Sequence, residues 1–205
     1  MKTVDPAQWR AFATAATSLA PLGPEALQSL CALLEARRFD NGTWLLEAGQ
    51  RAQWCFYVEQ GLVRELYIDE QGQEHTRTLV SAGHFTGSLL DLLSGEPSVT
   101  WLQALEPTRT LAFRFADFEA LCLRHADLNM LARRVAEQLY VRKARREHEL
   151  LAWPAARRYA AWRTVNPTLE ARVSQRVLAS YLGITPEHLS RLRRAEPARS
   201  DGGEH

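Results

Sequence analysis

Residues 173–194 read VSQRVLASYLGITPEHLSRLRR, the most informative stretch of the chain. Its first half carries apolar residues at helical spacing, and Ser174 stands where a helix N-cap is expected. Gly183 follows at a point where the chain must turn sharply and a side chain would be costly. Thr185 and Pro186 suit the cap and the first residue of a second helix. The stretch therefore predicts two short helices joined by a tight turn.

The second helix is expected to carry a polar outward face. Leu189 and Leu192, three residues apart, can pack against the first helix. This leaves four residues on the outward side, namely Glu187, His188, Arg191 and Arg194. Arginine can donate two hydrogen bonds to guanine O6 and N7, and glutamate can accept one from cytosine N4. The pattern is typical of a helix-turn-helix that reads the major groove of DNA, although a helical hairpin with a basic rim is the alternative.

The predicted DNA contacts extend along both helices. They are Ser174, Thr185, Glu187, His188, Ser190, Arg191, Arg193 and Arg194. The Ser190 hydroxyl, Arg193 and Arg194 are best interpreted as phosphate contacts, which position a protein on DNA without reading its sequence.

The charges of the chain are distributed unevenly. Residues 1–132 carry 10 Lys and Arg against 16 Asp and Glu, a net charge of −6, whereas residues 133–205 carry 15 against 8, a net charge of +7. This asymmetry suggests two modules, of which the basic one suits phosphate, although a solvated helix face is the alternative. No apolar run is long enough to span a membrane. Three separated cysteines (Cys31, Cys55 and Cys122) favour a reducing compartment over a disulfide framework or a metal knuckle.

The sequence of the middle of the chain is typical of short β-strands. Short apolar runs at 54–58, 62–68, 76–80 and 110–115 are separated by recurring glycines. Residues 62–68 partly alternate, and residues 69–72, DEQG, close the run as a hairpin turn would. Several short strands of this kind predict a sandwich or barrel. A short helix beginning at Pro24 is expected before them.

Residues 126–151 contain neither Gly nor Pro and predict one long helix. At roughly 1.5 Å per residue this helix is about 40 Å long. Its single apolar stripe, formed by Leu128, Leu131, Val135 and Leu139, suggests pairing with a second copy of the chain. The alternative is a helix folded back on its own domain. Pro154 ends or kinks the helix.

Together these features resemble the Crp/Fnr family of bacterial regulators, in which a β-roll sensor domain is joined by a dimerisation helix to a DNA-binding domain. The resemblance is most specific over residues 178–187 with Leu189, Ser190 and Arg191. It also covers residues 45–49, 57–64 and 95–98, and it spans about residues 25–194.

The resemblance implies an α+β fold. Its parts are an N-terminal antiparallel, jelly-roll-like β-roll with flanking helices, a long dimerisation helix, and a C-terminal all-α helix-turn-helix domain lacking a full wing. The expected boundaries are 1–125, 126–151 and 152–205, and the polar residues 195–205 are expected to be a disordered tail. The implied function is that of a cytoplasmic transcription regulator, not an enzyme. Its implied partners are a second copy of the chain, a palindromic operator in double-stranded DNA, and RNA polymerase.

The sequence departs from the family pattern at the effector pocket. Members that bind cyclic AMP hold its phosphate with a Glu just after a Gly, and with an Arg-Ser pair about ten residues later. The matching positions here are Gly87-Ser88 and Ser98-Val99, which supply no cation. Since a buried phosphate needs a cation or a cluster of donors, we expect a degenerate pocket, partly filled by Trp101, and no response to cyclic nucleotides.

Other kinds of site are less favoured by the residues. A small-molecule, haem or redox sensor of the same fold is the main alternative, but the chain lacks a clustered N-terminal cysteine set, and no axial haem ligand is singled out. A cupin-like metal enzyme would depend on His75 and His84, which lack His-x-His spacing. No Gly-x-Ser-x-Gly elbow or P-loop is present. We therefore expect no catalytic residue, metal site or cofactor, and the effector stays unidentified.

Overall fold

The structure, a computed structural model, describes residues 6–195, with side chains from Trp9 onward. The chain divides into two compact units, Met1–Ala144 and Arg145–His205, called here the N-terminal and C-terminal units. The tail expected to be disordered lies, from residue 196 on, outside the described residues.

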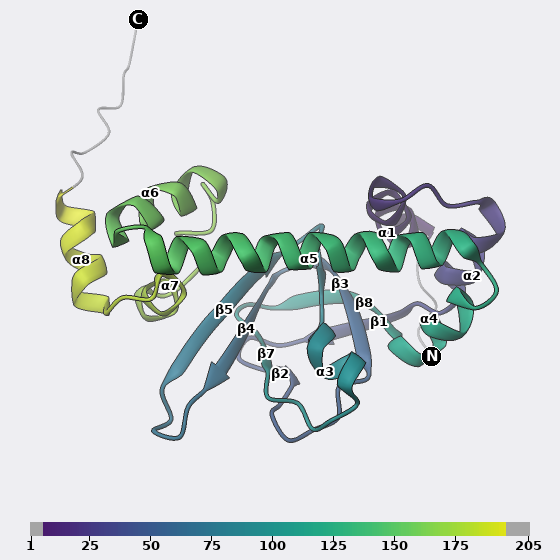
Figure 1. The fold of residues 1–205 in the computed structure, drawn as a ribbon, viewed down its shortest axis with the longest axis horizontal. Helices are drawn as coiled ribbons and strands as arrows, with labels where there is room; N and C mark the ends of the chain where they lie inside the picture. The colour runs from purple at the N-terminus through teal and green to yellow at the C-terminus, as the bar shows by residue number, and fades with distance from the viewer. Residues whose placement is uncertain (1–5, 196–205) are drawn as a thin grey trace, which may run out of the picture. The chain divides into compact units, whose positions relative to one another are not determined.

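The N-terminal unit is built on two antiparallel four-stranded sheets (Figure 1). One sheet has the order β1-β8-β3-β6 and the other the order β2-β7-β4-β5. The strands are β1 (Glu35–Phe39), β2 (Trp44–Leu46), β3 (Trp54–Gln60), β4 (Leu62–Ile68), β5 (Glu74–Ser81), β6 (Phe85–Thr86), β7 (Trp101–Ala104) and β8 (Thr108–Arg114). The antiparallel β-roll is thus confirmed, as an open roll of two sheets and not as a closed barrel.

The β4–β5 hairpin forms where the turn residues predict it. The Gly72 N–H donates to the Asp69 carbonyl oxygen at 2.9 Å. The Asp69 N–H donates to the Gln73 carbonyl oxygen at 3.0 Å. The Asp69 carboxylate also accepts hydrogen bonds from the N–H groups of Gln71 and Gln73. Since these bonds satisfy the backbone of the turn, the hairpin register is fixed locally.

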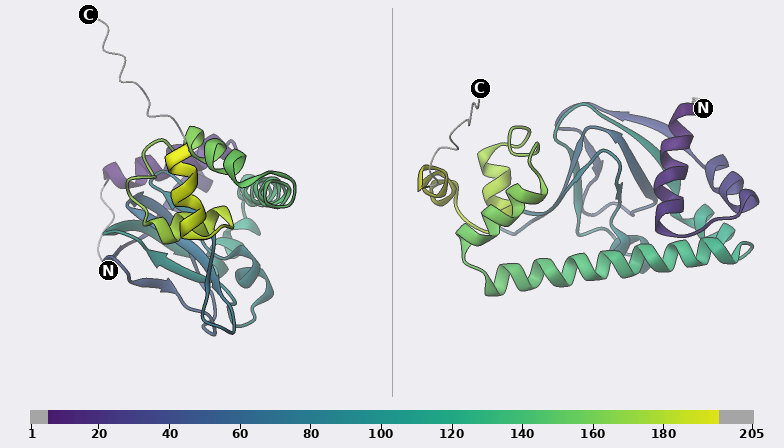
Figure 2. Two further views of the ribbon diagram at one scale, coloured as in Figure 1. Left: turned by 90° about the vertical axis from the view of Figure 1, so that its left-hand side faces the viewer. Right: turned by 90° about the horizontal axis from the view of Figure 1, so that it is seen from above.

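The two faces of the first sheet are buried differently, because successive side chains of a strand point to opposite sides. Phe56, Val58 and Ala112 face the second sheet in a small apolar core with Val63 and Leu102. The other face packs against the helices α1 (Pro6–Leu19), α2 (Pro24–Ala32), α4 (Phe115–Cys122) and the first part of α5 (Ala126–Ala152). Figure 2 shows these helices gathered at one end of the roll.

Helix α5 runs from Ala126 to Ala152, close to the predicted 126–151. Leu128 and Leu131, however, are 0% and 5% exposed within the core of their own chain, and Val135 packs against that core. The prediction that these side chains face a second copy is corrected, because the chain's own helices and sheet already cover them. Leu139 is half-buried. The other side of α5 exposes Met130, Tyr140 and Val141.

The C-terminal unit is helical. It contains the end of α5, then α6 (Ala155–Val165), α7 (Gln175–Leu182) and α8 (Pro186–Ala195). Pro154 separates α5 from α6, as expected, and is the N-cap residue of α6. Across the described residues, none of the helices combines the length and the apolar character needed to cross a membrane.

Candidate nucleic-acid interface and effector pocket

Helix α7 begins and ends at the predicted residues. The Ser174 side chain accepts a hydrogen bond from the Val177 N–H at 3.2 Å, which caps the first turn. Gly183 closes the helix with φ 66° and ψ 40°, the left-handed conformation that costs a glycine nothing. The inner face carries Val177, Leu178 and Leu182, all buried.

Helix α8 starts from a cap that the sequence also predicts. The Thr185 hydroxyl oxygen accepts from the His188 N–H at 3.2 Å, and Pro186 occupies the first helical position. Leu189 is fully buried, whereas Leu192 is only half-buried. The Gln175 amide donates to the Pro186 carbonyl oxygen at 2.7 Å, which ties the start of α7 to the start of α8.

Arginines outside the two helices hold the turn between them. Arg146, near the end of α5, donates to the Tyr181 carbonyl oxygen, and its guanidinium lies 4.2 Å from the Tyr181 ring centroid. Arg158 of α6 donates to the Leu182 carbonyl oxygen at 3.0 Å. The last carbonyls of a helix have no partner within it, so these two arginines satisfy groups that would otherwise need water.

The outward face of α8 presents Glu187, Arg191 and Arg194, which are all exposed. Glu187 has a pKa below its ordinary value, because its own backbone N–H and the Thr185 hydroxyl donate to it and Arg191 lies nearby. Arg194 donates to the Ser190 hydroxyl oxygen at 3.1 Å. An ionised acceptor and two cationic donors thus share one helix face, with His188 half-buried beside them.

Arg193 has a different environment from the other predicted contacts. Its Nε lies 3.1 Å from an oxygen of Glu170, which also pairs with Arg163 at 3.0 Å and accepts from the Tyr159 hydroxyl. Arg193 therefore anchors α8 to the preceding helices of the unit. Glu170 was not singled out in the sequence, where a lone acidic residue among basic ones gives no sign of its partners.

The predicted pocket positions surround a buried carboxylate. Ser88 and Ser98 are 1% and 3% exposed, and Gly87 precedes them in the chain. The Ser98 hydroxyl donates to Oδ2 of Asp91 at 2.5 Å, and the Ser88 and Thr100 hydroxyls lie 3.0 Å apart. Val99, in contrast, is 57% exposed. Asp91 and Thr100 were missed in the sequence, although a charged residue inside the run LLDLL is an available signal.

The expectation that Trp101 fills this pocket is corrected. Trp101 lies on β7 next to Leu102, whose side chain belongs to the core between the sheets. Successive residues of a strand point to opposite sides, so Trp101 faces away from that core. Its ring packs edge-on against Trp44, with centroids 5.0 Å apart.

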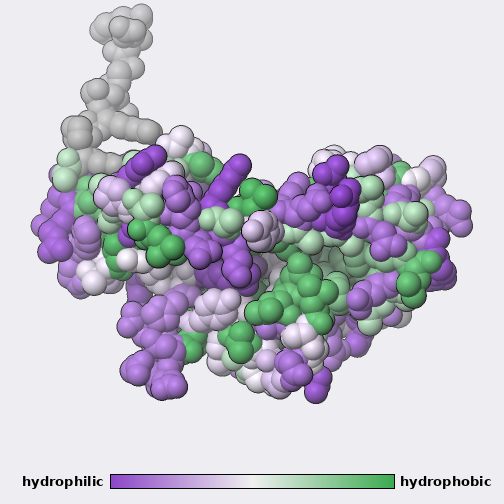
Figure 3. Space-filling view, in the orientation of Figure 1, coloured by the Kyte–Doolittle hydropathy of each residue, from purple (hydrophilic) through white to green (hydrophobic). Residues whose placement is uncertain are grey.

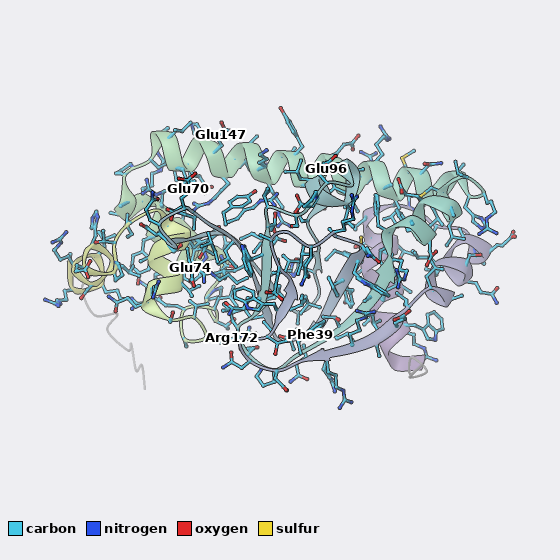
Figure 4. All side chains as sticks on the ribbon, turned by 90° about the horizontal axis from the view of Figure 1, so that it is seen from below. Phe39, Glu70, Glu74, Glu96, Glu147 and Arg172 are labelled. Atoms are coloured by element: carbon cyan, nitrogen blue, oxygen red, sulfur yellow. The ribbon has the colours of Figure 1, made fainter. Side chains whose placement is uncertain are left out.

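Two arginines of the second sheet, Arg64 on β4 and Arg77 on β5, already have acidic partners. Nη1 of Arg64 lies 2.6 Å from a carboxylate oxygen of Glu74, a residue of β5 that is labelled in Figure 4. Nε of Arg64 donates to the Thr76 hydroxyl oxygen at 2.8 Å. Arg77 lies 3.6 Å from Glu65, whose carboxylate also accepts from the Thr86 hydroxyl at 2.8 Å. Burial raises the pKa of Glu65, against the opposing effect of Arg77, Thr86 and Arg142.

Among the described residues, the histidines and cysteines form no metal-binding cluster. His75 and His84 are exposed, and within residues 6–195 no group of three metal-binding side chains comes together. Burial raises the pKa of all three thiols, that of Cys55 to about 12. Since the thiolate is the reactive form, these cysteines lack the lowered pKa of a redox-sensing residue.

Comparisons with known proteins agree with this architecture. Residues 36–125 match the family model described as the cyclic nucleotide-binding domain. The cyclic AMP receptor protein of Thermus thermophilus is 28% identical over 183 residues, covering 83% of this chain and 81% of that protein. The cAMP-activated global transcriptional regulator CRP of Pasteurella multocida is 27% identical over 103 residues, and the match spans about half of each protein, 50% and 49%.

A solved structure supports the fold independently. FixK2 from Bradyrhizobium japonicum superposes with a TM-score of 0.68 at 17% identity, covering 78% of this chain and 83% of the FixK2 chain. At this identity the likeness concerns the fold. Taken with the roll, the long helix, the capped α7–α8 pair and the matched domain, it shows that the chain has the fold of the Crp/Fnr regulators and is similar to proteins of that family.

Proposed function

We propose that this protein is a sequence-specific DNA-binding transcription regulator of the Crp/Fnr type. The observation that carries the proposal is the outward face of α8, where Glu187 and Arg191 stand exposed on a helix capped by Thr185. The relatives from Thermus and Pasteurella are named as a cyclic AMP receptor and a transcriptional regulator, which supports the same function here.

In this proposal α8 is the recognition helix. Arg191 would donate two hydrogen bonds to guanine, and the ionised Glu187 would accept one from a cytosine amino group. Ser190 and Arg194, already hydrogen-bonded to each other, would contact phosphates. Ser174, Thr185 and His188 would lie at the same surface, near the helix starts. Arg193 would act mainly by holding α8, because Glu170 engages it.

We also propose that the protein acts as a homodimer through the exposed side of α5. Positions 130, 134, 137, 141 and 144 follow the spacing of a coiled-coil seam; Met130, Val141 and Ala144 are its apolar members, and Arg134 and Glu137 fill the other two positions as an ion pair 3.2 Å apart. Met130 and Val141 are 38% and 45% exposed in the single chain. The dimer contact is therefore assigned to this side rather than to Leu128 and Leu131.

The domain division that accompanies this proposal is a β-roll over 1–125, a dimerisation helix over 126–151 and a DNA-binding domain over 152–205. A palindromic operator follows from two recognition helices related by a two-fold axis. RNA polymerase is the expected protein partner, and the cytoplasm the expected site of action, as for regulators of the Crp/Fnr family.

The pocket is proposed to be degenerate toward cyclic nucleotides. Ser88 and Ser98 stand where the resemblance places the phosphate ligands, and their hydroxyls are already used within the chain. Arg64 and Arg77 are paired with Glu74 and Glu65, which offset their charges, so we assign the absent cation to neither, although Nη2 of the buried Arg64 has no hydrogen-bond partner among the described residues.

The test is a binding-site selection from random duplexes by the full chain and two variants. We expect the wild type to enrich a two-fold palindrome with half-sites roughly 10–11 base pairs apart. Arg191→Ala should lose about 1–3 kcal/mol at that site and flatten the preference at one base position of each half-site. Arg38→Ala, which removes an exposed arginine of β1, is the control and should enrich the same palindrome. An unchanged preference in Arg191→Ala would remove Arg191 from base reading.

A further inference from the structure

Helix α3 (Leu89–Ser94) reverses the usual arrangement, because it exposes leucines to solvent and buries its one charged side chain. Leu90 and Leu93 are 57% and 65% exposed, whereas Asp91 between them is 3% exposed. Figure 3 shows apolar side chains gathered on the surface of the N-terminal unit near this helix. Burying a carboxylate while exposing leucines is unfavourable unless the carboxylate gains hydrogen bonds, so the environment of Asp91 must provide them.

The donors around Asp91 come from both sides of α3, because Ser88 precedes the helix and Ser98, Val99 and Thr100 follow it. The Ser98 hydroxyl donates to Oδ2 at 2.5 Å, and the Ser88 and Thr100 hydroxyls and the Val99 N–H also bond to the carboxylate. Burial by itself would raise the pKa of Asp91, but these hydrogen bonds outweigh it and lower the pKa below its ordinary value. The carboxylate is therefore ionised at neutral pH.

The donors are held in place by bonds of their own. The Ser98 N–H donates to the Gln50 carbonyl oxygen at 2.7 Å, and the Gly49 N–H donates to the Ser98 carbonyl oxygen at 2.8 Å. The Thr100 N–H donates to the Ser98 hydroxyl oxygen at 3.0 Å. The hydroxyl oxygens of Ser88 and Thr100 lie 3.0 Å from each other. Three hydroxyls and a backbone N–H thus converge on the Asp91 carboxylate. The backbone that carries Ser98 is itself held by hydrogen bonds to Gln50 and Gly49.

We propose that Ser88, Ser98, Thr100 and the Val99 N–H form a built anion-binding site, which the chain fills with its own carboxylate, Asp91. The inference deepens the proposed function and rests on it in one respect, namely that this site lies in the effector pocket. Asp91 is then the residue that sets the specificity of the pocket, since it satisfies the donors an external phosphate would need and adds a negative charge beside them.

The test vacates the site and offers it small anions. Asp91→Ala removes a volume close to that of formate and leaves the four donors in place. We expect the full-length variant to melt below the wild type, and sodium formate to restore several degrees of melting temperature relative to sodium chloride at equal ionic strength. Formamide, which has the same shape but no charge, should restore none of it.

Asp117→Ala is the matched control. Asp117 occupies the third position of α4, as Asp91 does in α3, but its side chain is exposed. Formate should leave the melting temperatures of this variant and of the wild type unchanged relative to chloride. Equal shifts in all three proteins, equal rescue by formamide, or no rescue of Asp91→Ala would each overturn the proposal.

A second measurement applies if Asp91→Ala does not fold. Asp91→Asn keeps the side-chain volume, removes the charge and replaces one accepting oxygen with an amide group that donates. We expect its effect on the free energy of unfolding to be strongly non-additive with that of Ser98→Ala, because both break one contact. Additive effects would contradict the proposal. These readouts involve no DNA, so operator binding by Asp91→Asn, measured separately, distinguishes a failure of this inference from a failure of the proposed function.

Discussion

Single residues of the C-terminal unit divide into those that build the interface and those that would use it. Ser174, Gly183 and Thr185 make the α7–α8 pair, since each supplies a cap or a backbone conformation that few other residues can supply. Arg191 has no comparable structural task and is exposed, and Glu187 is exposed as well, although it also accepts hydrogen bonds at the start of α8. A polar residue whose contacts do not stabilise the fold is a better candidate for recognition than one with a structural partner, such as Arg193.

At the residue scale, Glu65 should give the N-terminal unit a measurable pH dependence. Its pKa is raised by burial, so the folded state binds the proton more tightly than the unfolded state does. The resulting stability is present at low pH and is lost as the pH rises through the folded pKa. Arg77, Thr86 and Arg142 face this carboxylate and oppose the shift without abolishing it.

Urea unfolding of the wild type and of Glu65→Gln between pH 5 and pH 8 tests this account. The free energy of unfolding of the wild type should fall relative to that of the variant as the pH rises. Glu119→Gln, on an exposed position of α4, should track the wild type across the range. A difference between wild type and Glu65→Gln that stays constant with pH would show that Glu65 does not titrate there.

At the scale of elements, the turn between α7 and α8 depends on Gly183. A side chain there would adopt φ +66°, which costs an L-residue about 1–2 kcal/mol. Its Cβ would also lie 3.1 Å from Cδ2 of Leu150, tighter than ordinary contact. Gly183→Ala should therefore lower the free energy of unfolding by at least that amount and weaken operator binding, measured by urea unfolding and fluorescence anisotropy. Gly72→Ala, at φ +77° in the β4–β5 turn with open space around its Cβ, should reduce stability without weakening binding.

The sequence predicts an element well where local rules and tertiary packing agree. β4 runs from Leu62 to Ile68 as expected, because the DEQG turn fixes its end, although its first five residues are all buried and do not alternate. The α7–α8 pair was equally predictable from its caps. Helix α3 was not, because its leucines suggest a buried apolar face, whereas the hydrogen bonds of Asp91 turn the polar side inward.

The stripe on α5 shows a second limit of sequence reasoning. Periodicity identified Leu128 and Leu131 as buried, which they are. It could not say which surface buries them, since the core of a chain and the seam of a coiled coil require the same apolar spacing. Here the helices α1, α2 and α4 supply that surface.

At the scale of the whole molecule, the dimer contact can be tested by choosing between the two sides of α5. Met130→Glu with Val141→Glu places like charges in the proposed seam and should give folded monomers in sedimentation experiments. Leu131→Ala is the comparison on the inner side. It should cost about 2–5 kcal/mol of stability, as large-to-small core substitutions do, and leave the dimer intact. An intact dimer in the glutamate variant would place the interface elsewhere.

We propose that the protein reads a palindromic operator and does so without a cyclic nucleotide. The most direct measurement is the dissociation constant for the selected palindrome and for a scrambled duplex, at one fixed salt concentration, with and without 1 mM cyclic AMP. We expect binding to the palindrome to be at least about 1,000-fold tighter, as for specific DNA-binding proteins generally. Cyclic AMP should change neither constant. Equal affinity for the two duplexes, or tight binding that appears only with cyclic AMP, would contradict the account.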